Sequence, residues 1–117
     1  MLTPDKVSNV YLACQSTDMR KSIDGLAAIV QQHFKLDPFA DCLFIFCNRN
    51  RNKVKILHWE YNGFWLYYKR LEKGRFQWLN SDQDVQCISQ RELRWLLDGL
   101  PLDQPKAHKR VYADSII

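Results

Sequence analysis

The sequence has little of what nucleotide-binding and metal-dependent enzymes usually need. Among its 117 residues the four glycines stand alone, at positions 25, 63, 74 and 99, so there is no glycine-rich phosphate loop. The four cysteines and three histidines are scattered and contain no C-x-x-C pair, whereas zinc ligands are normally paired at short spacing. We therefore predict that the protein uses no cofactor and no metal ion.

Long apolar runs are also missing. The longest, at residues 26–31 and 42–47, fall far below the roughly 18 residues that span a bilayer. The start of the chain, MLTPDKVSN, has no apolar region of the kind found in signal peptides. These absences predict a cytoplasmic protein with no membrane partner, whose cysteines are free thiols. The length and the 46% hydrophobic content indicate one globular domain. We place it at residues 1–104, followed by a basic, flexible tail at 105–117.

The acidic residues do not point to catalysis. A two-metal nuclease core needs several carboxylates close together, but the aspartates here fall at predicted caps and turns, where aspartate has a structural role: Asp18, Asp37, Asp41, Asp82, Asp84 and Asp98. Cys47 stands beside a basic loop that could lower its pKa, but no histidine is close in sequence, so a buried thiol is favoured. We predict that the chain alone is not an enzyme. A nuclease would require acids that converge in space.

What the sequence does have is a basic and aromatic central segment. Residues 48–78 contain eight basic and only two acidic residues, together with eight of the 15 aromatic residues. Cations neutralise phosphates and aromatic rings stack on bases, so this mixture favours a polyanion partner. The alternative is an ordinary sheet with its rings in the core and its lysines in water.

Hydrophobic spacing predicts an α+β fold in a single domain. Alternating or apolar runs indicate strands at 7–14, 42–47, 53–60, 64–70 and 75–79, with Asn62-Gly63 as a tight turn. Apolar residues at three- and four-residue spacing indicate helices at 17–34 and 90–100, and Ser89 and Glu92 match a capping box. The predicted order is β-α-β-β-β-β-α, a mostly antiparallel sheet of about five strands. The long helix packs on it and the second lies at an edge or end.

Three stretches carry a family resemblance and cover most of the chain: YLACQSTDMRKSIDGLAAIVQ at 11–31, LDPFADCLFIFCNRNRNKVKILHWEYNGFWLYYKRLEKGRFQW at 36–78 and ELRWLLDGL at 92–100. In this order they resemble the TnpB-type accessory protein, the small second reading frame, of IS66-family bacterial insertion sequences. One departure is Ser22, where the family pattern usually has glycine. The resemblance implies a role in transposition beside a larger transposase that carries the catalytic acids, and it leaves the molecular activity of the small protein open.

Residue chemistry then suggests how such a protein would act. We predict that it contacts DNA, at the element ends, through phosphate-binding cations: Arg49, Arg51, Lys53, Lys55, Lys69, Arg70, Lys73 and Arg75, joined by Arg20 and Lys21 beside the first helix. Trp65 and Tyr67 are candidates for base stacking or for contact with a partner.

A second hypothesis is a protein-interaction adaptor that does not bind DNA itself. Residues 64–68, FWLYY, are five large side chains in a row, although a strand buried on one face needs only alternate ones. Either both faces of this strand are covered within the domain, or one face contacts a partner. The partner would be the larger transposase or another copy of the chain, which makes a homo-oligomer possible.

Overall fold

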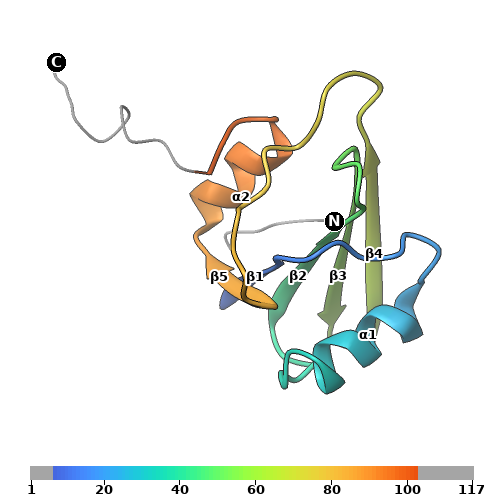
Figure 1. The fold of residues 1–117 in the computed structure, drawn as a ribbon. Coiled ribbons are helices and arrows are strands. Elements are labelled where there is room, and N and C mark those ends of the chain that lie inside the picture. The colour runs from blue at the N-terminus through green and yellow to red at the C-terminus, as the bar shows by residue number, and fades with distance from the viewer. Residues whose placement is uncertain (1–6, 103–117) are drawn as a thin grey trace, which may run out of the picture.

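The computed structural model describes residues 7–102 as a five-stranded sheet with one helix on each face (Figure 1). The elements follow in the order β1 (Asn9–Ala13), α1 (Ile23–Gln32), β2 (Cys42–Cys47), β3 (Lys53–Glu60), β4 (Gly63–Arg70), β5 (Val85–Ile88) and α2 (Gln90–Leu97). The sheet is mixed but mostly antiparallel, so the predicted α+β class is confirmed. The predicted tail at 105–117 lies outside the described residues.

Strand order across the sheet is β4-β3-β2-β1-β5. β1 and β2 are parallel because the chain crosses over through α1 between them, and every other neighbouring pair is antiparallel. β2 lies at the centre, and all six of its residues are buried. This explains why its sequence, CLFIFC, is apolar at every position rather than at alternate ones.

The two faces of the sheet carry separate hydrophobic cores. On one face Leu26 and Val30 of α1 pack with Phe44 and Phe46. On the other face Leu93 and Leu96 of α2 pack in one cluster with residues of β1, β2 and β3. The second helix therefore packs on this face together with Phe76 and Trp78 of the segment after β4, whereas the sequence suggested an edge or an end. Neither helix in the described range is long and apolar enough to cross a bilayer.

The first helix is shorter than predicted. It begins at Ile23 rather than at residue 17, and Ser22 occupies the N-cap position without a capping bond from its side chain. The preceding loop is instead tied to the sheet, because the Thr17 amide donates to the Cys47 carbonyl over 2.8 Å. Asp18 bonds Arg20 locally, a side-chain interaction that competes with helix formation. Ser22 is exposed, so the serine of this chain extends into solvent.

The predicted strand at 75–79 is wrong. Residues 71–84 form no strand; the fifth strand is β5, which pairs with β1 and was missed because it is short and has polar Gln86 at its centre. The alternation that suggested a strand is real, since Phe76 is buried and Trp78 packs beside it against the core. However, the Phe76 amide donates to the Arg51 carbonyl in a neighbouring loop (2.7 Å) and not to a strand.

Turn and cap residues are partly as expected. The Ser89–Glu92 capping box is present, and it begins α2 as predicted, although the helix ends at Leu97 rather than at residue 100. The turn between β3 and β4 uses Tyr61 and Asn62, because Glu60 pairs with Gly63. The tight turn is thus shifted by one residue from the predicted Asn62-Gly63. Tyr61 takes a φ of 60°, which is unusual for a bulky residue.

Candidate nucleic-acid interface

An asparagine network fixes the loop between β2 and β3. The Asn48 side-chain oxygen accepts from the amides of Asn52 and Lys53, both at 3.0 Å, and its nitrogen donates to the Asn52 side chain at 2.7 Å. Arg51 in the same loop has a φ of 60°. The loop therefore has a defined shape, and exposed Arg49 lies within it.

This loop is bonded directly to the segment that follows β4. The Leu71 amide donates to the Asn52 carbonyl over 2.8 Å, and the Phe76 amide donates to the Arg51 carbonyl over 2.7 Å. In addition, Lys53 pairs with Arg70 across the two strands. Cations that are about 20 residues apart in sequence are thereby brought to the same end of the sheet.

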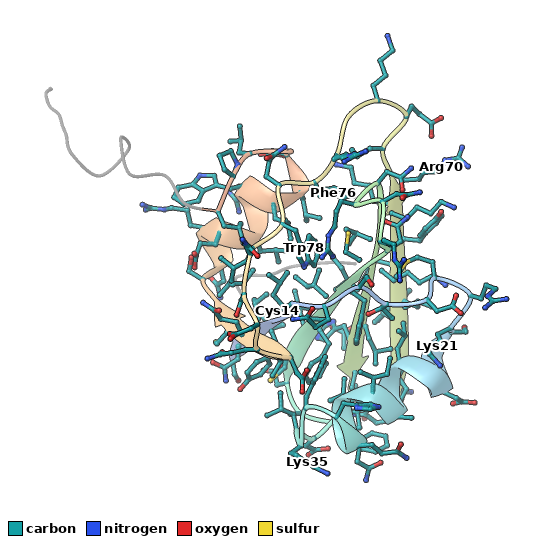
Figure 2. All side chains as sticks on the ribbon, in the orientation of Figure 1. Cys14, Lys21, Lys35, Arg70, Phe76 and Trp78 are labelled. Atoms are coloured by element: carbon teal, nitrogen blue, oxygen red, sulfur yellow. The ribbon has the colours of Figure 1, made fainter. Side chains whose placement is uncertain are left out.

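The loop before α1 reaches the same end. The Lys55 ammonium group donates to the carbonyls of Met19 and Lys21, at 2.7 and 2.8 Å, which holds this loop beside β3. In Figure 2 Lys21 and Arg70 lie along the same side of the molecule, with Lys21 just before α1 and Arg70 at the end of β4. We call this end of the sheet the basic end and define it by seven residues: Arg20, Lys21, Arg49, Lys53, Arg70, Lys73 and Arg75.

The other predicted phosphate contacts, Arg51, Lys55 and Lys69, make contacts within the protein, although Lys69 is itself exposed. The Arg51 guanidinium lies 5.4 Å from the centroid of the Trp78 ring, and one of its terminal nitrogens is buried without a hydrogen-bond partner. Lys55 bonds carbonyl groups, as described above. Lys69 projects from the opposite face of β4 and donates to the Leu97 carbonyl at the end of α2 (2.8 Å). These three cations stabilise the loops and the helix that frame the basic end.

Few carboxylates offset the charge of the basic end. The three segments that meet there, residues 15–21, 48–55 and 69–76, hold ten basic and two acidic residues, an excess of eight positive charges. Both acids pair with basic-end arginines: Asp18 with Arg20 at 2.7 Å and Glu72 with Arg70 at 2.8 Å. Hydrogen bonds from Arg20 lower the pKa of Asp18 from 3.8 to about 2.

The predicted stacking residues lie elsewhere. Trp65 is near the start of β4, five residues from Arg70, which corresponds to about 17 Å along an extended strand. Its indole N–H donates to the Glu60 carboxylate at 2.7 Å, and its ring stacks on Tyr67 with centroids 6.0 Å apart. Burial raises the pKa of Tyr67, with nearby Glu60 adding to the effect.

Trp65 belongs to a group of rings at the other end of the sheet, which we call the aromatic end. Phe39 contacts Trp59 and Phe64 with centroids 5.0 and 5.4 Å apart. Three of its rings are strongly exposed: Tyr61 (93%), Phe39 (56%) and Trp65 (47%). Sequence reasoning did not propose Phe39, Trp59 or Tyr61 for any site, although the exposed rings flank a turn and a proline. The aromatic end is defined by Phe39, Trp59, Tyr61, Phe64 and Trp65.

The cysteines give no reactive site in the described structure. Burial raises the pKa of the Cys47 thiol, and the adjacent Arg51 only partly opposes this effect. Cys42 and Cys47 belong to the cores on opposite faces of β2, because residues five apart on a strand point to opposite faces. Within residues 7–102, no group of three or more histidine, cysteine or acidic side chains is placed to hold a metal ion.

Comparison with known proteins identifies the family. The family model described as IS66 Orf2-like protein matches residues 8–107, which include both ends of the sheet. The chain belongs to the IS66 Orf2-like family. This confirms the resemblance drawn from the sequence, and it makes the protein an accessory protein of IS66 transposition.

Two curated relatives of this IS66 Orf2-like protein come from Sinorhizobium fredii (strain NBRC 101917 / NGR234), and both are described as uncharacterized. The protein named y4hO is 34% identical over 106 residues, covering 91% of this chain and 92% of the relative. The protein named y4jC is 27% identical over 100 residues, covering 86% of each. No solved structure matches the chain.

Proposed function

We propose that this IS66 Orf2-like protein is a non-catalytic accessory protein that binds DNA phosphates through its basic end. The observation that carries the proposal is the pair of backbone hydrogen bonds that join the 48–52 loop to the segment after β4. These bonds bring cations from separate parts of the chain into one cluster. A cluster of this kind neutralises several adjacent phosphates and releases their counterions.

The chemistry of the cluster favours backbone contact over base reading. Its lysine and arginine side chains extend from loops and strand ends, where they can contact phosphates along the DNA backbone. Within residues 7–102, none of the seven residues of the basic end lies in a helix; Arg20 and Lys21 precede α1, and the others are in loops or at strand ends. Phosphate contacts position a protein on DNA without specifying sequence. Discrimination of the element ends would then come from the transposase or from DNA shape.

The test is a salt titration of binding to labelled element-end DNA, with a scrambled duplex and a single strand measured in parallel. Each phosphate contact on duplex DNA contributes about 0.9 to the slope of log affinity against log salt. The double variant Arg49→Ala/Lys73→Ala should therefore reduce the slope by about 1.8. The matched control, Arg91→Ala/Arg94→Ala, removes the same charge from α2 and should leave the slope unchanged.

Two results would count against the proposal. One is the absence of binding to all three DNAs at low salt. The other is an equal loss of slope in both double variants, which would mean that only net charge matters and that the basic end is not a site.

A second candidate function rests on the aromatic end. Exposed rings such as Tyr61, Phe39 and Trp65 are enriched at protein interfaces, where they anchor binding. The adaptor hypothesis places the larger transposase on this end. Pull-down of purified transposase by the wild type, but not by the double variant Phe39→Ser/Tyr61→Ser, would support it. Retention of the transposase by the double variant would contradict it.

A further inference from the structure

The two edges of the sheet differ in length and in exposure. β4 forms one edge over eight residues, none of them buried, while β5 forms the other over only four. In the part of the chain that the structure describes, β4 pairs only with β3, so the backbone groups on its outer side have no strand partner. An edge of this length without proline is a template for another strand.

The chemistry of β4 changes along its length. Residues 63–68 are uncharged and carry the rings of Phe64 and Trp65, with the Glu60 carboxylate close to Trp65. The last two residues are Lys69 and Arg70. Lysine on an edge usually discourages pairing between edges. Here the two cations occupy one end only, so their effect depends on the direction of the incoming strand.

We propose that β4 pairs antiparallel with β4 of a second copy of this chain, forming a continuous ten-stranded sheet. A two-fold axis perpendicular to the sheet relates the strands, so each residue opposes one on the same face. The register that centres on Tyr67 places Lys69 of one copy opposite Trp65 of the other, and Arg70 opposite Phe64. Each cation then meets an aromatic ring, and Lys69 also approaches the Glu60 carboxylate.

Charge complementarity selects this partner and this direction. A parallel arrangement would align Lys69 with Lys69 and Arg70 with Arg70, and like charges directly opposite are destabilising. The antiparallel arrangement instead separates the two copies of Lys69 by about 13 Å, four residues of strand, and the two copies of Arg70 by about 20 Å, six residues of strand. It also places the two basic ends at opposite ends of the joined strands. The proposal does not depend on DNA binding, and it is tested without DNA.

The first experiment measures the mass of the full chain by analytical ultracentrifugation from 1 to 100 μM. We expect concentration-dependent dimers. Trp65→Lys brings two lysines opposite each other, and it should raise the dimer dissociation constant at least tenfold. The matched control Gln86→Lys adds an exposed lysine to the other edge strand and should have no effect. Tyr68→Glu, at a residue 54% exposed on β4, repeats the test if Trp65→Lys does not fold.

The second experiment tests the register by disulfide crosslinking. Cys87, the exposed cysteine of the described range, is first replaced by serine, because Cys14, Cys42 and Cys47 are buried. Equal amounts of Trp65→Cys and Lys69→Cys chains are then mixed and oxidised. The mixture should give the mixed dimer, whereas Trp65→Cys alone should not crosslink, because the two positions are four residues out of register.

Several outcomes would overturn the proposal. These are a wild type that is monomeric at 100 μM, dimers that Trp65→Lys and Tyr68→Glu leave unchanged, and crosslinks formed through Gln86→Cys on β5. Each would mean that another segment or another protein covers the β4 edge, or that it stays uncovered. Because no DNA is present, failure here leaves the proposed phosphate binding intact, and failure of phosphate binding leaves the dimer intact.

Discussion

The two ends of the sheet are built from the same two strands but have opposite chemistry. At the basic end, three segments contribute ten basic and two acidic residues; at the aromatic end, residues 37–41 and 58–65 contribute three acidic residues and no lysine or arginine. β3 runs from the first end to the second, and β4 returns. A single hairpin thus gives the molecule two distinct surfaces.

The ends also differ in what holds them together. Backbone hydrogen bonds join the loops of the basic end, and carbonyl groups accept from Lys55 across 2.7 and 2.8 Å. At the aromatic end the contacts are between rings, such as Trp59 with Phe64 at 4.9 Å. Mutually repelling cations need a framework that fixes the backbone, whereas rings attract one another directly. We therefore expect the contribution of the basic end to the free energy of unfolding to come from buried side chains. The contribution of the aromatic end should come from exposed rings.

The largest effect is expected from the anchor of the basic end. Phe76 is 2% exposed and its segment is bonded to the 48–52 loop, so Phe76→Ala should lower the free energy of unfolding by about 3–5 kcal/mol. Phe39→Ala at the aromatic end, where the ring is 56% exposed, should cost about 1 kcal/mol or less. Urea denaturation of both variants measures the difference. Equal losses would show that the two ends are stabilised in the same way.

A second prediction compares the same charge change at the two ends. Lys73→Glu at the basic end should weaken DNA binding about tenfold at 0.1 M salt, through a lost phosphate contact and added repulsion. Lys35→Glu changes net charge by the same amount, but Lys35 lies at the end of the molecule opposite Arg70 (Figure 2). It should change the affinity by less than about twofold. Similar losses in both variants, measured by fluorescence anisotropy, would remove the distinction between the ends.

Local patterns in the sequence predicted most of the sheet. β2 and β3 were predicted with their observed bounds, because an apolar run and an alternating run are independent of what they pack against. The capping box at Ser89 was found for the same reason, since both of its residues lie within one turn. The predicted strand at 75–79 was wrong because alternation indicates which residues are buried. It does not indicate whether a neighbouring strand is present to pair with them.

The candidate site was predicted as a set of residue types but not as a surface. Sequence spacing could not show that the loop before α1 reaches β3, since the contact depends on Lys55 donating to the carbonyls of Met19 and Lys21. Sequence spacing also could not show that Arg49 is exposed to solvent whereas Arg51 is turned into the protein. The two arginines are two residues apart in a polar loop, and only the left-handed backbone at Arg51 and the position of the Trp78 ring turn one of them inward.

The third prediction separates these two arginines. Arg51→Ala should lower the free energy of unfolding by about 1 kcal/mol, because a partly buried guanidinium loses its contact with the Trp78 ring. It should leave the salt dependence of DNA binding unchanged. Arg49→Ala should do the reverse, with stability unchanged and the slope reduced by about 0.9. A reduced slope in Arg51→Ala, at full stability, would place Arg51 on the phosphate-binding surface after all.

The smallest effect concerns a carboxylate at the basic end. The Arg20 side chain and backbone lower the pKa of Asp18 from 3.8 to about 2, so the ionised form is favoured in the folded state. The stabilisation is complete above about pH 4 and is lost as the pH falls toward 2. Because both side chains are exposed, the effect on unfolding should be barely measurable. An NMR titration of the Asp18 carboxyl carbon should instead show a midpoint near 2.

The same titration also tests whether the basic end meets phosphate. Arg20→Gln should return the Asp18 midpoint toward 3.8. If a DNA phosphate takes over the Arg20 guanidinium, then added DNA should raise the midpoint in the same direction, because the carboxylate loses its donor and gains a negative neighbour. In Arg20→Gln, DNA should raise it less. A midpoint near 2 both with and without saturating DNA would mean that Arg20 stays with Asp18 and that phosphate contact falls to the other cations of the basic end.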